Sequence, residues 1–369
     1  MILSQEEQQI FLDGVAQFAQ QQVIPETTPY ETPMDGQTLI RLANELEALG
    51  IIAPLEEVPL GLWADVAETS TLNLDLLRLI GKANAALALV IQRKALTHWL
   101  LRATGLATNG TDIALTLTGH YGLARSSLGK WLNGHSRLAD EDTVLLSDWL
   151  DRQRHGSTLW TTAHCKQVLW PLWKGDNIQW QLIDKGQLDI NSEIAHGLNE
   201  LDFFTAINSS AATGITTNLA REDSRKLYKN LLKMELLGLT AIGLGVLDRS
   251  SELAIEFAAM RVQGGTKIQE HAAVQIMLSE IRSTIKQVTH TLRGLQGSID
   301  HIPVSDAAAI RLNSSDLLVH ACHQVIQIHG GMGYMRDTGP EKYVRDQNML
   351  RLASGGVSSL LLLIHGVES

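Results

Sequence analysis

The sequence has little of what marks a secreted, membrane-spanning or nucleic-acid-binding protein. Its 369 residues include only two cysteines, Cys165 and Cys322, which lie far apart. This excludes a disulfide framework and favours a reducing compartment. The 40 acidic residues outnumber the 30 basic ones, and no long Lys/Arg run occurs, so nucleic acid is not an expected partner. The apolar run at residues 360–364 is too short to cross a bilayer, and the N-terminus lacks the basic and apolar segments of a secretory signal. We therefore expect a cytoplasmic protein with no membrane partner.

Metal-ligand patterns are also missing. No pair of cysteines has zinc-finger spacing, and the 13 histidines are scattered. His320, His323 and His329 lie on or beside one predicted helix, but no carboxylate completes a ligand set. We predict no metal site.

The two ends of the chain have the periodicity of helices. A capping box, Ser4–Glu7, opens a helix that we expect to end at Pro25. Further helices are predicted over residues 38–49, 72–101, 231–261, 270–292, 306–329 and 347–363. Long helices with short connections fold as antiparallel bundles. We therefore predict an N-terminal α domain over residues 1–110 and a C-terminal four-helix bundle over residues 213–369.

The middle of the chain, residues 111–212, has the pattern of a small β domain. Short segments bounded by Gly, Asn and Asp predict strands over residues 113–118, 143–147, 159–163, 167–173 and 177–183. Six of the eight tryptophans fall between Trp131 and Trp180. Packing of the β domain is their expected role, and lining of a ligand cleft is the alternative. The predicted fold class is mainly α with a shortened central β domain.

Specific motifs appear in the C-terminal third. Residues 323–334 read His-Gln-Val-Ile-Gln-Ile-His-Gly-Gly-Met-Gly-Tyr, and residues 340–346 read Pro-Glu-Lys-Tyr-Val-Arg-Asp. Upstream, Arg261 opens the sequence Arg-Val-Gln-Gly-Gly-Thr-Lys-Ile. These segments resemble the acyl-CoA dehydrogenase motifs Gln-x-x-Gly-Gly-x-Gly-[Tyr/Phe], Pro-x-Glu-[Arg/Lys]-x-x-Arg-Asp and Arg-x-x-Phe-Gly-x-x-Ile. Two departures occur: the glutamate follows Pro340 directly, and Gly264 replaces the phenylalanine. The resemblance implies the family's fold, with a small β-barrel or sandwich between two helical domains.

The resemblance also implies the α,β-dehydrogenation of an acyl-CoA thioester, with FAD as hydride acceptor and a buried carboxylate that removes the α proton. Most relatives carry this glutamate at the position of Ser354, whose hydroxyl is no comparable base. Relatives such as isovaleryl-CoA dehydrogenase carry it on a neighbouring helix, at the position of Glu235, 26 residues before Arg261. Glu235 is therefore the candidate catalytic base. A solvated or capping glutamate on a helix is the alternative.

Four residues are predicted by the same resemblance to bind FAD: Arg261, Gln327, Gly330 and Gly331. In the family, one subunit lends this half-site to its neighbour. A guanidinium suits a diphosphate because it donates two parallel hydrogen bonds, and glycines allow close backbone approach. The family's Thr-Glu-Pro-x-x-Gly-Ser-Asp and Trp-[Ile/Phe]-[Ser/Thr] segments are not recognisable; residues 114–119 and 159–162 are possible remnants. A surface arginine beside a plain turn is the alternative.

Three functions remain open from the sequence. The first is a self-sufficient acyl-CoA dehydrogenase. The second is a non-catalytic partner that completes the FAD site of an α2β2 dehydrogenase. The third is a flavin monooxygenase or oxidase on the same fold. The second function resembles the heterotetrameric enzymes of steroid-degrading bacteria. We expect an acyl-CoA substrate, a role in fatty acid or steroid β-oxidation, and a homo-oligomer or a heterotetramer with a second dehydrogenase-like subunit. The sequence leaves the acyl group open.

Overall fold

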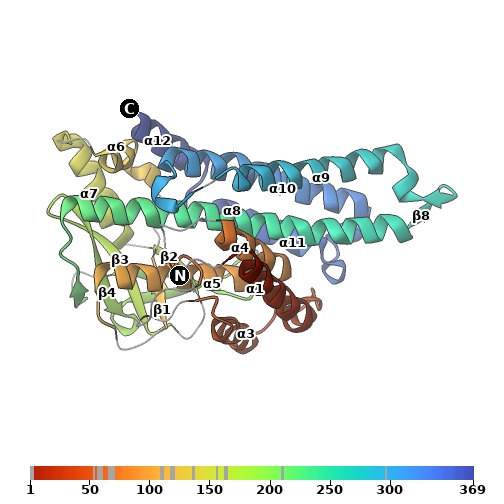
Figure 1. The fold of residues 1–369 in the computed structure, drawn as a ribbon, viewed down its shortest axis with the longest axis horizontal. Coiled ribbons are helices and arrows are strands. Elements are labelled where there is room, and N and C mark those ends of the chain that lie inside the picture. Colours follow the sequence, from red (N-terminus) through yellow and green to blue (C-terminus); the bar gives the residue numbers. More distant parts are fainter. Residues whose placement is uncertain are drawn as a thin grey trace.

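The computed structural model describes residues 4–52, 55, 61–64, 71–108, 112–116, 121–134, 138–154, 157–161, 165–208, 212–295 and 297–369. Helices dominate both ends of the chain, and two small sheets lie between them in sequence (Figure 1). The predicted fold class, mainly α with a central β region, is therefore confirmed.

Short helices build the N-terminal part: α1 (Gln5–Phe18), α2 (Ile24–Thr27), α3 (Gly36–Ala48), α4 (Thr71–Ala83) and α5 (Ala85–Thr104). The predicted capping box is confirmed, because the Ser4 hydroxyl accepts from the Glu7 backbone N–H and the Glu7 carboxylate accepts from the Ser4 N–H. The predicted end at Pro25 is wrong. The helical run instead continues through a π-helical turn, Ala19–Val23, into α2, where Pro25 is the second residue, and it ends at Thr27.

Asn84 separates α4 from α5, which the sequence suggested as one helical run. The Asn84 side chain accepts a hydrogen bond from the Leu87 N–H, as an N-cap does. Its amide also donates to Glu200 at 3.2 Å, and Glu200 pairs with Lys342, which pairs with Asp346. These buried groups join the N-terminal helices, the middle segment and the C-terminal bundle. The Pro-Glu-Lys-Tyr-Val-Arg-Asp motif thus has a structural role.

The middle segment contains strands β1 (Ile113–Leu115), β2 (Ser157–Thr161), β3 (Gln167–Lys174), β4 (Asn177–Asp184), β5 (Asp189–Glu193), β6 (Asp202–Ile207) and β7 (Gly214–Thr216), and helices α6 (Ser127–Asn133) and α7 (Asp140–Arg154). The sheets have the orders β1-β3-β4-β7 and β2-β6-β5. The predicted strand over residues 143–147 is wrong, because these residues lie in α7. Three acidic residues favour a helix start at Asp140, and Leu146, Trp149 and Leu150 form its buried face. Parts of the possible flavin-motif remnants, residues 117–119 and 162, lie outside the described residues.

The C-terminal part consists of α8 (Arg221–Met260), a hairpin of β8 (Val262–Gln263) and β9 (Thr266–Lys267), α9 (Ala272–Arg293), α10 (Val304–His329), α11 (Pro340–Leu352) and α12 (Val357–Glu368). The predicted helix over residues 347–363 is divided between α11 and α12, because Ser354 and Gly355 adopt positive φ values. Helix α8 runs along almost the whole molecule, and the β8–β9 hairpin projects at one end (Figure 1). Two segments, Arg221–Met260 and Pro340–Glu368, are long and apolar enough to cross a membrane. The apolar window of α8 is fully buried, as in a core helix, and the second segment contains the break between α11 and α12.

Candidate active site

The two positions that the sequence offered for a catalytic glutamate lie in contact. Glu235 is on α8 and fully buried, and Ser354 lies in the turn between α11 and α12. The Ser354 hydroxyl donates to Glu235 Oε1 at 2.5 Å. The Tyr121 hydroxyl donates to the Ser354 carbonyl and thereby holds this turn. The alternative of a solvated or capping Glu235 is therefore wrong.

Arg93 on α5 is a third member of this cluster, and the sequence analysis missed it. Its Nη2 atom lies 2.5 Å from Glu235 Oε1, so the carboxylate is held in a buried ion pair. Burial lowers the pKa of Arg93, and the charge of Glu235 opposes that shift. The only sequence signal was a charged residue inside the predominantly apolar helical run of residues 85–101.

A close helix contact brings Arg93 to Glu235. At Gly238, one turn after Glu235, an added Cβ would lie 2.3 Å from the Gln92 side chain. Gln92 is fully buried and donates to the Met234 carbonyl at 3.0 Å. The missing side chain at Gly238 therefore lets α5 approach α8 at the level of the carboxylate.

A second buried cation, Arg311 on α10, lies near the same carboxylate. Its Nη2 donates to the Leu350 carbonyl, while its Nε and Nη1 have no hydrogen-bond partner among the described residues. Burial lowers the pKa of Arg311 to about 10, and the charge of Glu235 opposes this shift. One carboxylate thus faces two guanidinium groups. Glu235 Oε1 is already paired, and its buried Oε2 accepts no hydrogen bond within the described part of the chain.

The predicted FAD-binding residues lie together at another place, the hairpin end of the bundle. Arg261 is the C-cap residue of α8, and Gln327 and Gly330 lie at the end of α10. The two helix ends adjoin, because the Phe257 ring stacks on His329 with 4.4 Å between the ring centres. Arg261 lies 26 residues after Glu235 on one helix, about 39 Å along its axis. A ligand held at Arg261 is therefore remote from Glu235 of the same chain.

These residues are open to solvent and suit a diphosphate. Arg261, Gln327, Gly330 and Gly331 are all exposed, and the Arg261 side chain forms no hydrogen bond or ion pair with the part of the chain that the structure describes. Gly330 has φ 59° and ψ −137°, a backbone conformation that requires glycine. At Gly331 an added Cβ would meet no atom within 4 Å, so packing inside this chain does not explain that glycine. A free guanidinium beside bare backbone matches the donors that a diphosphate requires.

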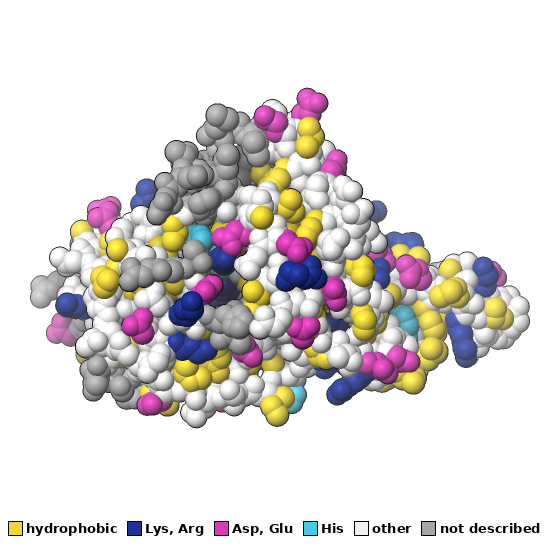
Figure 2. Space-filling view, turned by 90° about the horizontal axis from the view of Figure 1, so that it is seen from below, with side chains coloured by type: hydrophobic (Ala, Val, Ile, Leu, Met, Phe, Trp, Pro, Cys, Tyr) yellow, Lys and Arg dark blue, Asp and Glu magenta, His cyan; other side chains and the backbone are white. Residues whose placement is uncertain are grey.

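Large apolar side chains surround this end of the bundle. Exposure reaches 72% at Met260 and 74% at Tyr334, and further exposed apolar residues are Val262, Ile276, Met332 and Met335. Figure 2 shows hydrophobic and charged side chains intermingled on the narrow projecting end. An apolar surface of this kind favours association with another protein chain.

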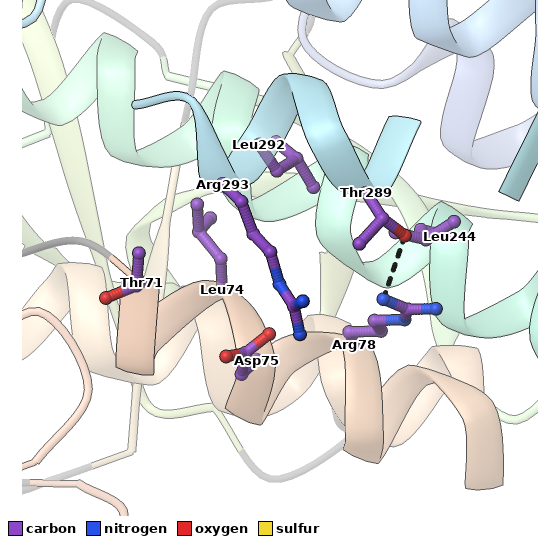
Figure 3. Close-up of a pocket in the computed structure, with 8 residues that line it drawn as sticks. All are labelled: Thr71, Leu74, Asp75, Arg78, Leu244, Thr289, Leu292 and Arg293. Carbon is purple, nitrogen blue, oxygen red and sulfur yellow. Dashed lines mark hydrogen bonds between the residues drawn. The ribbon is translucent and has the colours of Figure 1, made fainter. Parts of the chain in front are cut away.

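A small pocket between α4, α8 and α9 has a structural role (Figure 3). Arg78 pairs with Asp248 on α8 at 2.6 Å and donates to Thr289 on α9 at 3.0 Å. Arg293 extends toward Asp75 in the same view. Burial raises the pKa of Asp75, and the charges of Arg293 and Arg78 oppose the shift. The pocket has a volume of only about 10 Å³, roughly the space for one water molecule. Among the described residues, no group of three or more His, Cys, Asp or Glu side chains could hold a metal.

Comparison with known proteins defines the class of this fold. Butyryl-CoA dehydrogenase from Megasphaera elsdenii has 16% identity and a TM-score of 0.69, with 100% of this chain and 99% of that chain covered. The prolyl acyl carrier protein oxidase AnaB has 15% identity and a TM-score of 0.73, with 99% of each chain covered. The architecture is therefore the acyl-CoA dehydrogenase fold, which dehydrogenases and oxidases share.

Sequence comparison identifies the C-terminal part of the chain. Residues 226–365 match the acyl-CoA dehydrogenase C-terminal domain. The probable acyl-CoA dehydrogenase YngJ of Bacillus subtilis (strain 168) is 28% identical over 121 residues, which are 32% of each chain. The chain matches about a third of the length of its first curated relatives. Residues 226–365 thus form a C-terminal domain of the acyl-CoA dehydrogenase type, the whole chain has that fold, and the resemblance in the motifs is confirmed.

Proposed function

We propose that this chain is a subunit of an FAD-dependent acyl-CoA dehydrogenase assembly and lends Arg261 and residues 327–331 to the flavin site of a neighbouring subunit. One contrast supports this proposal. The buried carboxylate Glu235 is held by Arg93 and Ser354 of its own chain. The Arg261 guanidinium, about 39 Å away on the same helix, is exposed and free of partners among the described residues.

The lent residues have separate tasks. Bound FAD supplies the hydride acceptor for acyl-CoA oxidation. The Arg261 guanidinium donates paired hydrogen bonds to the diphosphate and neutralises part of its charge. The Gly330–Gly331 backbone approaches the cofactor without steric hindrance, and the exposed Gln327 amide supplies a further hydrogen-bonding group.

The neighbouring subunit in this proposal is a second acyl-CoA dehydrogenase-like chain that carries its own catalytic glutamate. The exposed apolar residues beside Arg261, among them Met260 and Tyr334, provide the surface that such a subunit covers. The acyl-CoA substrate then binds to the assembly at the glutamate of the second subunit. This arrangement gives one complete site to each pair of unlike chains.

Flavin content tests this assignment. The chain is purified alone and after co-expression with a dehydrogenase-like chain, and bound FAD is quantified by absorbance and mass by light scattering. We expect little FAD with the chain alone and a stable flavin-loaded complex with the partner. A stoichiometrically FAD-loaded and active homotetramer of this chain alone would contradict the proposal.

A self-sufficient dehydrogenase with Glu235 as base is the second candidate. The observation that favours it is the buried Glu235 Oε2 atom, which accepts no hydrogen bond from the described residues. On that alternative, Glu235→Gln abolishes turnover at unchanged FAD content, because an amide cannot take up the α proton.

A further inference from the structure

A cavity lies at the opposite end of α8 from Arg261. It has a volume of about 660 Å³ and opens between the first turns of α8, the end of α6 and the loop between α9 and α10. Four cationic side chains line it, Arg225, Lys226, Lys229 and Lys233, together with the carboxylates of Glu222 and Asp300 and the neutral or weakly basic residues Asn133, Gly134, Asn230 and His301. The four cations exceed the two carboxylates by two positive charges.

Helix geometry and one glycine gather these cations. Positions 225, 229 and 233 follow one another at intervals of four residues, and position 226 lies three residues before 229 and seven before 233, so all four share one face of α8. At Gly134, the C-cap residue of α6, an added Cβ would lie 2.6 Å from Arg225 Nη1. A glycine at this position therefore leaves room for the Arg225 guanidinium beside the cavity.

The carboxylates do not balance the cations. Asp300 Oδ1 accepts from the Asn230 amide at 2.5 Å, and its Oδ2 lies 4.0 Å from Lys226 Nζ. Arg225 Nε is buried and has no hydrogen-bond partner within the described residues. Lys233 is only 3% exposed, and its ammonium group donates to the carbonyl oxygens of Ile299 and Asp300.

Because these cations lie close together, they repel one another. Burial lowers the pKa of Lys229, and the charge of Arg225 lowers it further. Burial likewise lowers the pKa of Lys233 to about 8, with Asp300 opposing and Lys229 and Lys226 adding to the shift. A bound anion would offset this repulsion and stabilise the charged lysines.

We propose that this cavity binds a small molecule through a diphosphate group and holds it as a ligand that the chain does not transform. A single carboxylate ligand would leave part of the excess charge uncompensated, whereas a diphosphate offers enough negative charge and oxygen atoms for one guanidinium and three ammonium groups. The cavity volume lies in the range of about 300–1,000 Å³ that is typical of small-molecule sites.

Two observations separate this site from those described above. Residues 233 and 235 are two positions apart on α8, so their side chains point to nearly opposite sides of the helix. The cavity therefore faces away from Glu235. Arg225 also precedes Arg261 by 36 residues, about 54 Å along the helix. The inference is thus independent of the proposed flavin site.

Calorimetric titration with inorganic pyrophosphate, ADP and coenzyme A tests the site on the full-length chain. We expect pyrophosphate to bind the wild type and both Arg225→Gln and Lys229→Gln to weaken binding about tenfold or more. Lys286→Gln, an exposed lysine on α9 with the same charge change, is the matched control and should leave binding unchanged. Tighter binding of ADP or coenzyme A than of pyrophosphate identifies a nucleotide ligand, and equal or weaker binding identifies inorganic diphosphate.

The pH dependence of pyrophosphate binding provides a second readout, which does not depend on any variant. Because the Lys233 charge is lost as pH rises through about 8, pyrophosphate affinity should fall above that pH and binding should be accompanied by proton uptake. The charged or titratable groups around it that modulate this response are Glu222, Arg225, Lys226, Lys229, Asp300 and His301. The proposal is overturned if none of the three ligands binds, if Lys286→Gln weakens binding as much as Lys229→Gln, or if ADP or coenzyme A is recovered chemically altered.

Discussion

The middle and the C-terminal end of α8 place charged side chains in opposite environments, one buried and paired and the other exposed and unpaired. In the middle, Glu235 is fully buried, and Arg93 and Ser354 occupy its Oε1 atom. At the end, Arg261 is exposed beside backbone that only glycine permits. A charge paired within the chain contributes to the fold and is less available for chemistry. An unpaired charge on the surface is available to a ligand or a neighbouring subunit.

The largest expected effect comes from breaking the ion pair in the middle of the helix. Arg93→Met leaves Glu235 buried without the partner of its ion pair and should lower the free energy of unfolding by about 3 kcal/mol. This value is near the lower end of the usual range for a buried pair, because the Arg93 side chain is 18% exposed. Urea denaturation measures the change. Arg41→Met removes an exposed pair with Glu26 and Glu45 and should cost less than about 1 kcal/mol.

The double variant Arg93→Met with Glu235→Gln sharpens this test. Removing both charges leaves no unpaired carboxylate, but Arg311 then loses the nearby charge of Glu235, so the double variant should recover only part of the stability that Arg93→Met loses. If the stability losses of the two single variants simply add in the double variant, Arg93 and Glu235 do not act as a pair.

A smaller effect is expected at the serine of the same cluster. Ser354→Ala removes the 2.5 Å hydrogen bond to Glu235 and should lower the free energy of unfolding by about 1–2 kcal/mol, because its acceptor is a buried carboxylate. Ser279→Ala is the control, since that hydroxyl donates to the Gln275 carbonyl on an exposed surface of α9. If the free energy of unfolding falls equally little in both serine variants, Ser354 does not hold the Glu235 carboxylate in place.

The smallest effect on stability is expected at the exposed end of α8. Arg261→Gln should change the free energy of unfolding by no more than about 0.5 kcal/mol, because its side chain has no partner among the described residues. The same variant should lower the FAD content of the co-purified assembly. Arg282→Gln, at an exposed position of α9, should leave both quantities unchanged. Loss of stability in Arg261→Gln at full FAD content would reverse the assignment.

Much of this contrast could be predicted from the sequence. Local signals gave the capping box at Ser4 and the long helices of the bundle, and the motif resemblance gave Arg261 and the glycine turn as neighbours. The sequence also marked Glu235 and Ser354, although as alternatives. Their contact across 119 residues depends on how the α11–α12 turn packs against α8, which no local pattern contains.

Other features could not be found because they depend on tertiary contacts. Arg93 reaches Glu235 across 142 residues, and only the close approach at Gly238 makes that pair possible. The basic cavity needs α6 and the α9–α10 loop beside α8. The strand predicted over residues 143–147 was wrong because β-branched and apolar residues outweighed the acidic helix start before them. The joined helix over residues 347–363 was wrong because the positive φ at Ser354 was not expected of a serine.

Turnover per bound FAD in the co-purified assembly tests the central claim most directly, with Glu235→Gln compared with wild type. If the chain lends a flavin half-site and does no chemistry at its own carboxylate, both FAD content and turnover per FAD remain unchanged. Loss of turnover at full FAD content would show that Glu235 is the catalytic base and would contradict the account.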